Sequence, residues 1–348
     1  MHSLKEKTEV SPVTEKKQIY GLNYLRAIAC IFVVIFHVSP ISMDFWYARA
    51  VHVFIFASAV PIFILISLFL TELKIERHNY LLNKSYRLGK IYLLWAWLIP
   101  GILFLIARSS SALEAESLSI LDGRNIYSLI VNGANWPYKV YGVYFLVYLI
   151  ILSWIYWFLR PYMKSYARIQ NLFYGFCIIN LFLPYLPAQY HPIRESFVPF
   201  LIYLPLTKSI YYNYQKSVDY WRKAREYAFI YIIVTVFEAG IIAMSNRVDF
   251  ITYNYAPYSR LSIVFLAAAL VYISFTFKRK LSSSSEFLAL ISSCSLGIYL
   301  IHGFLIDYFR SVDLNSSSVW LFLIVFSLSI VFSSAIKELP LVKRILIL

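Results

Sequence analysis

Two ionisable side chains, Arg26 and His37, stand inside one long apolar stretch near the N-terminus, residues 22–43. Ionisable groups are expensive inside a bilayer, so each of them is a candidate site residue. A histidine titrates near neutral pH and can take a proton from a reacting hydroxyl group. The stretch therefore predicts a buried site in which His37 can act as a proton acceptor, with a cation on the same segment.

The spacing of the two residues places them on one face of a helix. Eleven helical steps of about 100° return to within about 20° of the starting direction, and the rise is about 16 Å. The side chains thus share a face but cannot touch. Arg26 could also be an anchor that reaches the membrane surface, and His37 a hydrogen-bonded packing residue. The shared face favours a common cavity over these two separate explanations.

The amino-acid composition indicates whether this helix belongs to a soluble protein or to a membrane protein. Of the 348 residues, 60% are hydrophobic and only 14% are charged, against about 25% charged in soluble proteins. These values exclude a soluble globular enzyme, a disordered chain and a disulfide-stapled secreted module. The three cysteines lie in apolar stretches without a CxxC pair, and we find no cluster of metal ligands. No metal site is therefore expected.

Ten stretches are long and apolar enough to be spans, since a spanning helix needs about 20 mostly apolar residues. The sixth contains Pro199 and Pro205 and is expected to be kinked or short. The predicted fold is an all-α polytopic membrane protein. The expected spans are 22–43, 50–71, 86–107, 140–159, 169–188, 195–212, 227–245, 259–277, 287–306 and 318–336.

The basic residues predict the orientation of these spans. When loops are assigned alternately to two sides, 24 of the 32 Lys and Arg fall on the side that holds both termini. The positive-inside rule therefore predicts cytoplasmic termini in a multi-pass protein of the cell membrane. The net charge of +14 then mostly reflects the basic residues on the cytoplasmic side of the membrane. Nucleic acid is therefore not an expected partner. The expected parts are a polar cytoplasmic tail (1–20), a ten-helix membrane domain (21–336) and a basic cytoplasmic tail (337–348).

Four motifs, taken in order, resemble the membrane acyltransferase family 3. The first is the pair Arg26 and His37 with ten residues between them. The second, Val60–Ser67, is similar to a Pro-x-Phe element in the second span of the family. The third, Lys84–Arg87, lies where the family tends to have Arg-x-x-Arg. The fourth, Ser295–His302, is similar to a late span ending in Tyr-Leu-x-His. The resemblance runs from residue 20 to about residue 310.

This resemblance implies transfer of an acyl group from cytoplasmic acyl-CoA to a carbohydrate hydroxyl. Acetyl is the first expectation and succinyl the second, and the acceptor would be an exopolysaccharide, a cell-wall polymer or a lipid-linked glycan. His37 would be the general base. Acyl-CoA is a co-substrate, so no permanently bound cofactor is expected, and a polysaccharide synthase is a possible partner. The residues expected to hold the phosphates of the donor are Arg26, Lys84, Arg87 and Lys90.

The chain departs from the family pattern at two positions. Lys84 replaces the first arginine of the third motif, and an ammonium cannot make the bidentate phosphate contact of a guanidinium. Leu68 stands where glycine is usual. Both departures lie in the stretches that the resemblance links to donor binding, so they weaken that assignment more than the assignment of His37.

Four further polar residues are candidates for acceptor binding or for supporting the base. Each also has a structural explanation. Ser67 can hydrogen-bond between helices, Glu238 can form a buried pair, and Tyr144 can belong to an aromatic belt at the membrane interface. His302 can be a packing residue. The candidates are Ser67, Glu238, His302 and Tyr144.

Two other functions remain open at this point. The chain also resembles the intercellular-adhesion C subgroup of the family, which has been viewed both as exporters and as O-acyltransferases. An exporter of exopolysaccharide or lipid-linked glycan is therefore one alternative, and a non-catalytic partner of a synthase is the other. His37 discriminates between them, because only an acyltransferase needs a titratable base there.

Overall fold

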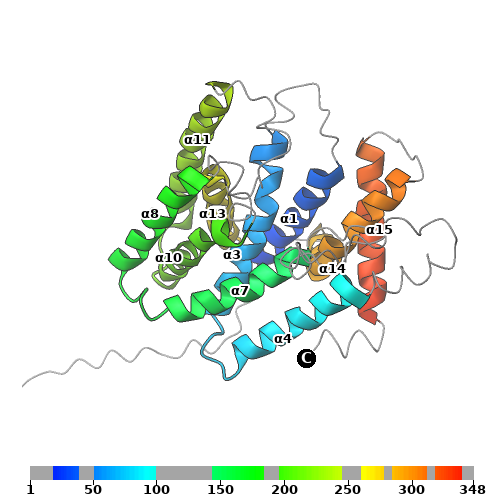
Figure 1. Cartoon of the computed structure of the whole chain (residues 1–348), viewed down its shortest axis with the longest axis horizontal. Coiled ribbons are helices and arrows are strands. Elements are labelled where there is room, and N and C mark those ends of the chain that lie inside the picture. Colours follow the sequence, from blue (N-terminus) through cyan, green and yellow to red (C-terminus); the bar gives the residue numbers. More distant parts are fainter. Residues whose placement is uncertain are drawn as a thin grey trace, which may run out of the picture.

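The computed structural model of the chain describes residues 19–38, 51–98, 143–183, 196–244, 260–277, 284–311 and 318–338. Every regular element in these ranges is a helix, which agrees with the predicted all-α class (Figure 1). The loop 108–139 lies outside the described residues, as do almost all of the two expected tails. The principal helices are α1 (Tyr20–Val38), α3 (Ala59–Glu72), α4 (Tyr80–Leu93), α7 (Val143–Leu159), α8 (Tyr166–Phe182), α10 (Tyr203–Gln215), α11 (Tyr220–Met244), α13 (Leu261–Thr276), α14 (Ser284–Ser311) and α15 (Ser318–Glu338).

Helix α1 lies at the centre of the bundle. It packs against α14, α3 and α13, and α14 in turn packs against α15 (Figure 1). Small side chains line the buried part of α1, among them Ala27, Ala29 and Cys30, none of which is exposed. Small residues let helix axes approach closely. The helix that carries Arg26 and His37 is therefore enclosed by neighbours over most of its circumference.

Two glycines mark the closest helix contacts. A methyl group on Gly21 would lie 1.7 Å from the carbonyl oxygen of Ser274, so α1 and α13 touch backbone to backbone there. A methyl group on Gly297 would lie 2.4 Å from Ser333 Oγ, where α14 meets α15. Neither distance is compatible with a side chain. Gly297 belongs to the fourth sequence motif, and the contact explains physically why glycine stands there.

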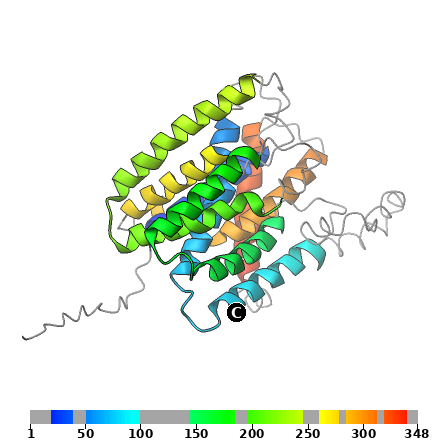
Figure 2. The same cartoon turned by 60° about the vertical axis from the view of Figure 1, so that its left-hand side comes forward.

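The remaining helices form a second group beside this core. Helix α11 runs beside α13, α10 packs against α3 and α8, and α4 packs against α7 (Figure 2). The sixth expected span is divided as its prolines predict. Residues Val198–Ile202 form a short 3₁₀ helix (η7), and α10 follows with Pro205 in its first turn. The result is a short α-helix that continues directly from one turn of 3₁₀ helix.

The outer surface carries many large apolar side chains, which water would disfavour and lipid would accept. Exposed examples on α11 are Phe229, Ile232 and Val236. By length and composition, four helical stretches could each cross a membrane: Tyr20–Val38, Val51–Glu72, Glu286–Arg310 and Val319–Glu338. Val143–Leu159 and Leu261–Thr276 are apolar but shorter. The structure thus has the character of a membrane protein, while the count of ten spans and the orientation of the termini stay predictions.

Candidate active site

Helix α1 places Arg26 near its start and His37 one residue before its end. Both side chains are half-buried. Between them, the thiol of Cys30 lies 3.8 Å from the carbonyl oxygen of Ser295, so α14 runs along the same part of α1. The candidate site therefore extends along the contact between α1 and α14, with the cation at one end and the imidazole at the other.

The imidazole of His37 lies against a second imidazole from α14. The ring centroids of His37 and His302 are 5.1 Å apart, and the rings are tilted by 42°. His302 is only 1% exposed, and its Nδ1 lies 3.1 Å from the Ile298 carbonyl oxygen. These two residues, which we call the histidine pair, are separated by 265 positions in the chain. The fold thus brings together two of the residues that the sequence had named as candidates.

Arg310 fixes the end of α1 next to the histidine pair. Its Nη2 donates to the carbonyl oxygen of His37 at 3.1 Å. The carbonyl groups at the end of a helix have no partner within the helix and carry partial negative charge, so a guanidinium is a favourable partner. The sequence did not single out Arg310 as a site residue. Its contact could not be read from spacing, because it depends on how α14 packs on α1.

Aromatic rings surround the histidine pair. The ring of His52 stacks on Phe36, with centroids 4.4 Å apart and planes 13° apart. On the other side, Tyr299 lies 5.9 Å from His302 and 5.0 Å from Phe145 between ring centroids. These rings place apolar surface around the pair. The placement of His52 near the site is a feature that the sequence did not reveal.

Tyr144 lies beside this aromatic layer. It is half-buried at the start of α7 and packs edge-to-face on Tyr148, with ring centroids 5.3 Å apart. Its neighbour Phe145 contacts Tyr299, which adjoins His302. Phe145 is thus two aromatic contacts away from His302, and the role of Tyr144 in acceptor binding stays a prediction.

The cations expected to bind the acyl donor are divided between two helices. Arg26 lies on α1, whereas Arg87 and Lys90 lie on α4, which packs against α7. Arg87 is exposed, and Lys90 places its ammonium 4.3 Å from the centroid of the Tyr86 ring. Within the part of the chain that the structure describes, α1 and α4 are not a closely packed pair. Their joint use in donor binding also stays a prediction.

Lys84 makes interior contacts instead of facing the surface. It is 7% exposed, and Nζ donates to Ser67 Oγ at 3.0 Å, Thr71 Oγ1 at 2.7 Å and Ser153 Oγ at 3.0 Å. We call these four residues the Lys84 cluster. Lys84 precedes the expected third span, and burial, with a smaller contribution from Arg87, lowers its pKa to about 7. Its ammonium joins α4 to α3 and α7, so Ser67 serves there as a contact between helices.

A second polar cluster lies at the end of α3. The buried carboxylate of Glu72 pairs with Arg160, 3.2 Å away, and with Lys208, and Arg160 also contacts Glu76 at 2.9 Å. These four residues form the Glu72 cluster. Two cations balance the one buried carboxylate, so this group joins α3 to the end of α7 and to α10. Sequence reasoning missed it because the partners lie 88 and 136 positions from Glu72.

Glu238 is used to cap a helix. It is buried on α11, and Oε1 accepts from the backbone N–H groups of Leu261 at 3.0 Å and Ser262 at 3.3 Å. Oε2 accepts from Ser262 Oγ at 2.5 Å. A carboxylate at a helix N-terminus satisfies N–H groups that have no partner within the helix. Glu238 thus has a structural role as a helix cap, which differs from the buried pair that the sequence suggested, and a role in acceptor binding stays a prediction.

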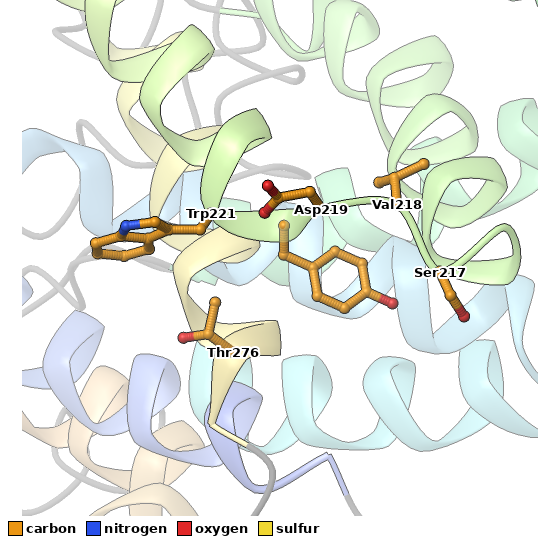
Figure 3. A pocket seen from close by; sticks show the side chains of 6 residues that line it. Ser217, Val218, Asp219, Trp221 and Thr276 are labelled. Atoms are coloured by element: carbon orange, nitrogen blue, oxygen red, sulfur yellow. The ribbon is translucent and has the colours of Figure 1, made fainter.

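A cavity of about 420 Å³ lies at the turn between α10 and α11 (Figure 3). Asp219 of this turn accepts from the Arg222 backbone N–H at 3.0 Å, which caps the start of α11. The cavity contains none of the predicted site residues. Its lining is Ser217, Val218, Asp219, Tyr220, Trp221 and Thr276.

The described residues contain no group of three or more His, Cys, Asp or Glu that could hold a metal ion. The chemistry available at the histidine pair is proton transfer by imidazole.

No curated protein and no solved structure matches the chain. The family model described as an acyltransferase domain matches residues 19–338, nearly the whole chain, and the protein therefore belongs to acyltransferase family 3 and is an acyltransferase.

Proposed function

We propose that this acyltransferase moves an acyl group, acetyl before succinyl, from acyl-CoA to a hydroxyl of a cell-surface or lipid-linked carbohydrate. His37 is the general base. The observation that carries this assignment is the position of the His37 imidazole, half-buried at the end of α1 and packed against His302. A neutral imidazole in apolar surroundings is a suitable acceptor for the proton of a weakly acidic hydroxyl.

The reaction needs one proton to be moved and one bond to be exchanged. The acceptor hydroxyl gives its proton to His37 as its oxygen attacks the thioester carbonyl carbon. A C–O bond forms, the C–S bond breaks, and His37 returns the proton to the departing CoA thiolate. Base catalysis of this kind contributes about 10²- to 10⁴-fold in rate. The products are an O-acylated carbohydrate and free CoA.

The acyl donor binds from the end of the bundle where α1 begins. Arg26, with Arg87 and Lys90 from α4, supplies cations for the CoA phosphates. Lys84 contributes less directly, because its ammonium is engaged by three hydroxyl groups. The rise of about 16 Å between Arg26 and His37 gives the pantetheine arm a path along α1 toward the base.

The chain crosses the cell membrane ten times, with both termini in the cytoplasm. Each of the ten expected spans contains helix among its described residues, which supports this topology. The placement also agrees with the distribution of basic residues, most of which fall on the side of the termini. Arg26 then lies near the cytoplasmic pool of acyl-CoA, and His37 lies in the outer half of the membrane.

The direct test is the O-acyl content of surface and lipid-linked glycans, measured by mass spectrometry. Strains would carry the wild type, His37→Ala or Arg26→Ala, with the membrane level of each protein matched by immunoblot. His78→Ala and Arg77→Ala are matched controls, because both residues are exposed in the turn before α4. Loss of one acyl mass per repeat in the two test variants, with the glycan still exported, is the expected result.

Two other results would redirect the proposal. If acylation continues in the His37→Ala strain, His37 is not the base. If the glycan accumulates inside the cell while its acylation is unchanged, the protein acts as an exporter. A synthase partner without its own chemistry would tolerate both substitutions.

A further inference from the structure

His302 has a defined hydrogen position. Its Nδ1 lies 3.1 Å from the Ile298 carbonyl oxygen, one turn earlier in α14. A carbonyl oxygen only accepts, so Nδ1 carries the hydrogen and donates it. A second proton on this ring would place a charge in an apolar interior, at high cost. The ring is therefore neutral, and Nε2 presents a lone pair.

That lone pair is buried without a partner. Among the described residues, Nε2 of His302 has no hydrogen-bond donor. Buried polar atoms are rarely left in this state, because each one destabilises the folded protein. The neighbouring ring is that of His37, with the two centroids 5.1 Å apart. Because hydrogen bonds join heavy atoms about 3 Å apart, a small rotation of the tilted rings is enough to connect two nitrogens at this separation.

We infer that His302 is a positioning residue whose Nε2 accepts the second N–H of His37, so that the other nitrogen of His37 faces the acceptor hydroxyl. This inference rests on the proposed role of His37 as the base. It adds a defined tautomer for both rings: each carries one hydrogen, and a chain of hydrogen bonds runs from His37 through His302 to the Ile298 carbonyl oxygen. The geometry resembles the orienting group of a catalytic triad, with a neutral imidazole as the acceptor.

The arrangement accounts for the movement of each hydrogen. Before reaction, His37 donates its one hydrogen to His302 and keeps a lone pair for the hydroxyl. When His37 takes the hydroxyl proton, the same hydrogen bond stabilises the imidazolium, because charge-assisted hydrogen bonds are stronger. His37 then passes that proton to the CoA thiolate, and His302 stays neutral throughout. Ring orientation and charge stabilisation are thus supplied by one side chain.

Two other ionisable residues near His37 make contacts that differ from that of His302. Arg310 contacts the backbone carbonyl of His37, and the His52 ring is stacked on Phe36. The titratable and charged groups at this end of the helices packed around His37 are His52, Arg260, His302, Asp307 and Arg310.

A pair of amide variants separates positioning from packing. In His302→Gln, the amide can place an oxygen near the former Nε2 and accept from His37. In His302→Asn, the shorter amide can still donate to Ile298 but cannot reach His37. For purified protein in lipid, we expect His302→Asn to lower kcat about 10- to 100-fold without changing the KM for acyl-CoA. His302→Gln should recover most of that loss, and equal kcat values for the two folded variants would overturn the inference.

A measurement on the wild-type protein remains decisive if a variant does not fold. Nitrogen-15 NMR of histidine-labelled protein in bilayers at neutral pH should show His302 with a hydrogen on Nδ1 and none on Nε2, with the signals assigned in the His37→Gln variant. A hydrogen on Nε2 would refute the inference. This readout does not depend on acyl transfer, so failure of His37 as the base and failure of His302 as its partner are distinguishable.

Discussion

At the end of α3 the fold surrounds a buried carboxylate with cations, whereas at the end of α1 it places two imidazoles together, and one nitrogen has no partner in the described part of the chain. In the Glu72 cluster, Glu72 has both Arg160 and Lys208 as partners. In the histidine pair, Nε2 of His302 has no partner among the described residues. The two regions use buried polar groups for different purposes.

The difference follows from what each arrangement contributes. A buried carboxylate is stabilised by paired cations and becomes strongly destabilising when the partners are removed, so the Glu72 cluster holds helices together. An incompletely bonded imidazole stabilises the fold poorly, but it can gain and lose a proton without a large structural change. We therefore expect the first region to control stability and the second to control catalysis.

Replacement of His37 by alanine should have the largest effect. Loss of a general base lowers rates by about 10²- to 10⁴-fold, so kcat should fall by that amount. Acyl transfer from radiolabelled acyl-CoA in proteoliposomes measures it, and the thermal unfolding temperature should remain close to that of wild type. His78→Ala, at an exposed position, is the control. A large loss of stability in His37→Ala would place this residue in the structural region instead.

Replacement of Glu72 by glutamine should give the opposite pattern. It removes the carboxylate but leaves Arg160 and Lys208, both partly buried, without their shared partner. We expect the free energy of unfolding to fall by up to about 3 kcal/mol, with kcat per folded molecule unchanged. Glu76→Gln is a matched control, because the Glu76 side chain is 83% exposed. Equal unfolding temperatures for the two variants would contradict the comparison.

The pH dependence of activity should follow the histidine pair. Imidazolium cannot accept a proton, so acyl transfer should decrease as the pH falls far enough to protonate His37. The measurement is the initial rate between pH 5 and 8, the range in which histidine charge commonly changes, under conditions in which chemistry limits the rate. A flat profile over this range would exclude His37 as the base.

The pH dependence of stability should instead depend on Lys84. Its pKa is lowered to about 7 in the folded protein from 10.5 in the unfolded chain. The unfolded state then binds more protons between these values, so the contribution of Lys84 to stability rises with pH across this window. Unfolding temperatures at pH 7 and pH 9.5 should differ less in Lys84→Met than in wild type. Thr71 and Ser153 keep hydrogen bonds to Ser67 and Leu149 carbonyls in this variant.

Removal of two cations of α4, the exposed Arg87 and the half-buried Lys90, should have the smallest effect. For Arg87→Gln and for Lys90→Gln we expect the KM for acyl-CoA to rise about two- to fivefold with kcat unchanged, since an exposed ion pair contributes up to about 1 kcal/mol. The increase should weaken at high salt. Arg77→Gln is the control, because Arg77 is exposed outside α4. An unchanged KM in both variants would remove α4 from the donor site.

Sequence alone was sufficient for features that depend on local pattern. The apolar segments predict helices, the spacing of Arg26 and His37 places them on one helix face, and the ordered motifs identify the family. The division of the sixth span follows from Pro199 and Pro205. Each of these features is determined by residues close together in the chain, or by backbone geometry that is the same in every helix.

Only the tertiary structure decided which polar groups are paired. It placed His302 against His37, and it buried Lys84 where its ammonium donates to three hydroxyl groups. It also used Glu238 to cap α13. These partners come from different helices, and a rotation or a one-turn shift of a helix would exchange them without altering the apolar pattern. Sequence composition therefore determined that the chain folds as apolar helices, while helix packing determined which ionisable groups stabilise the fold and which are left available for chemistry.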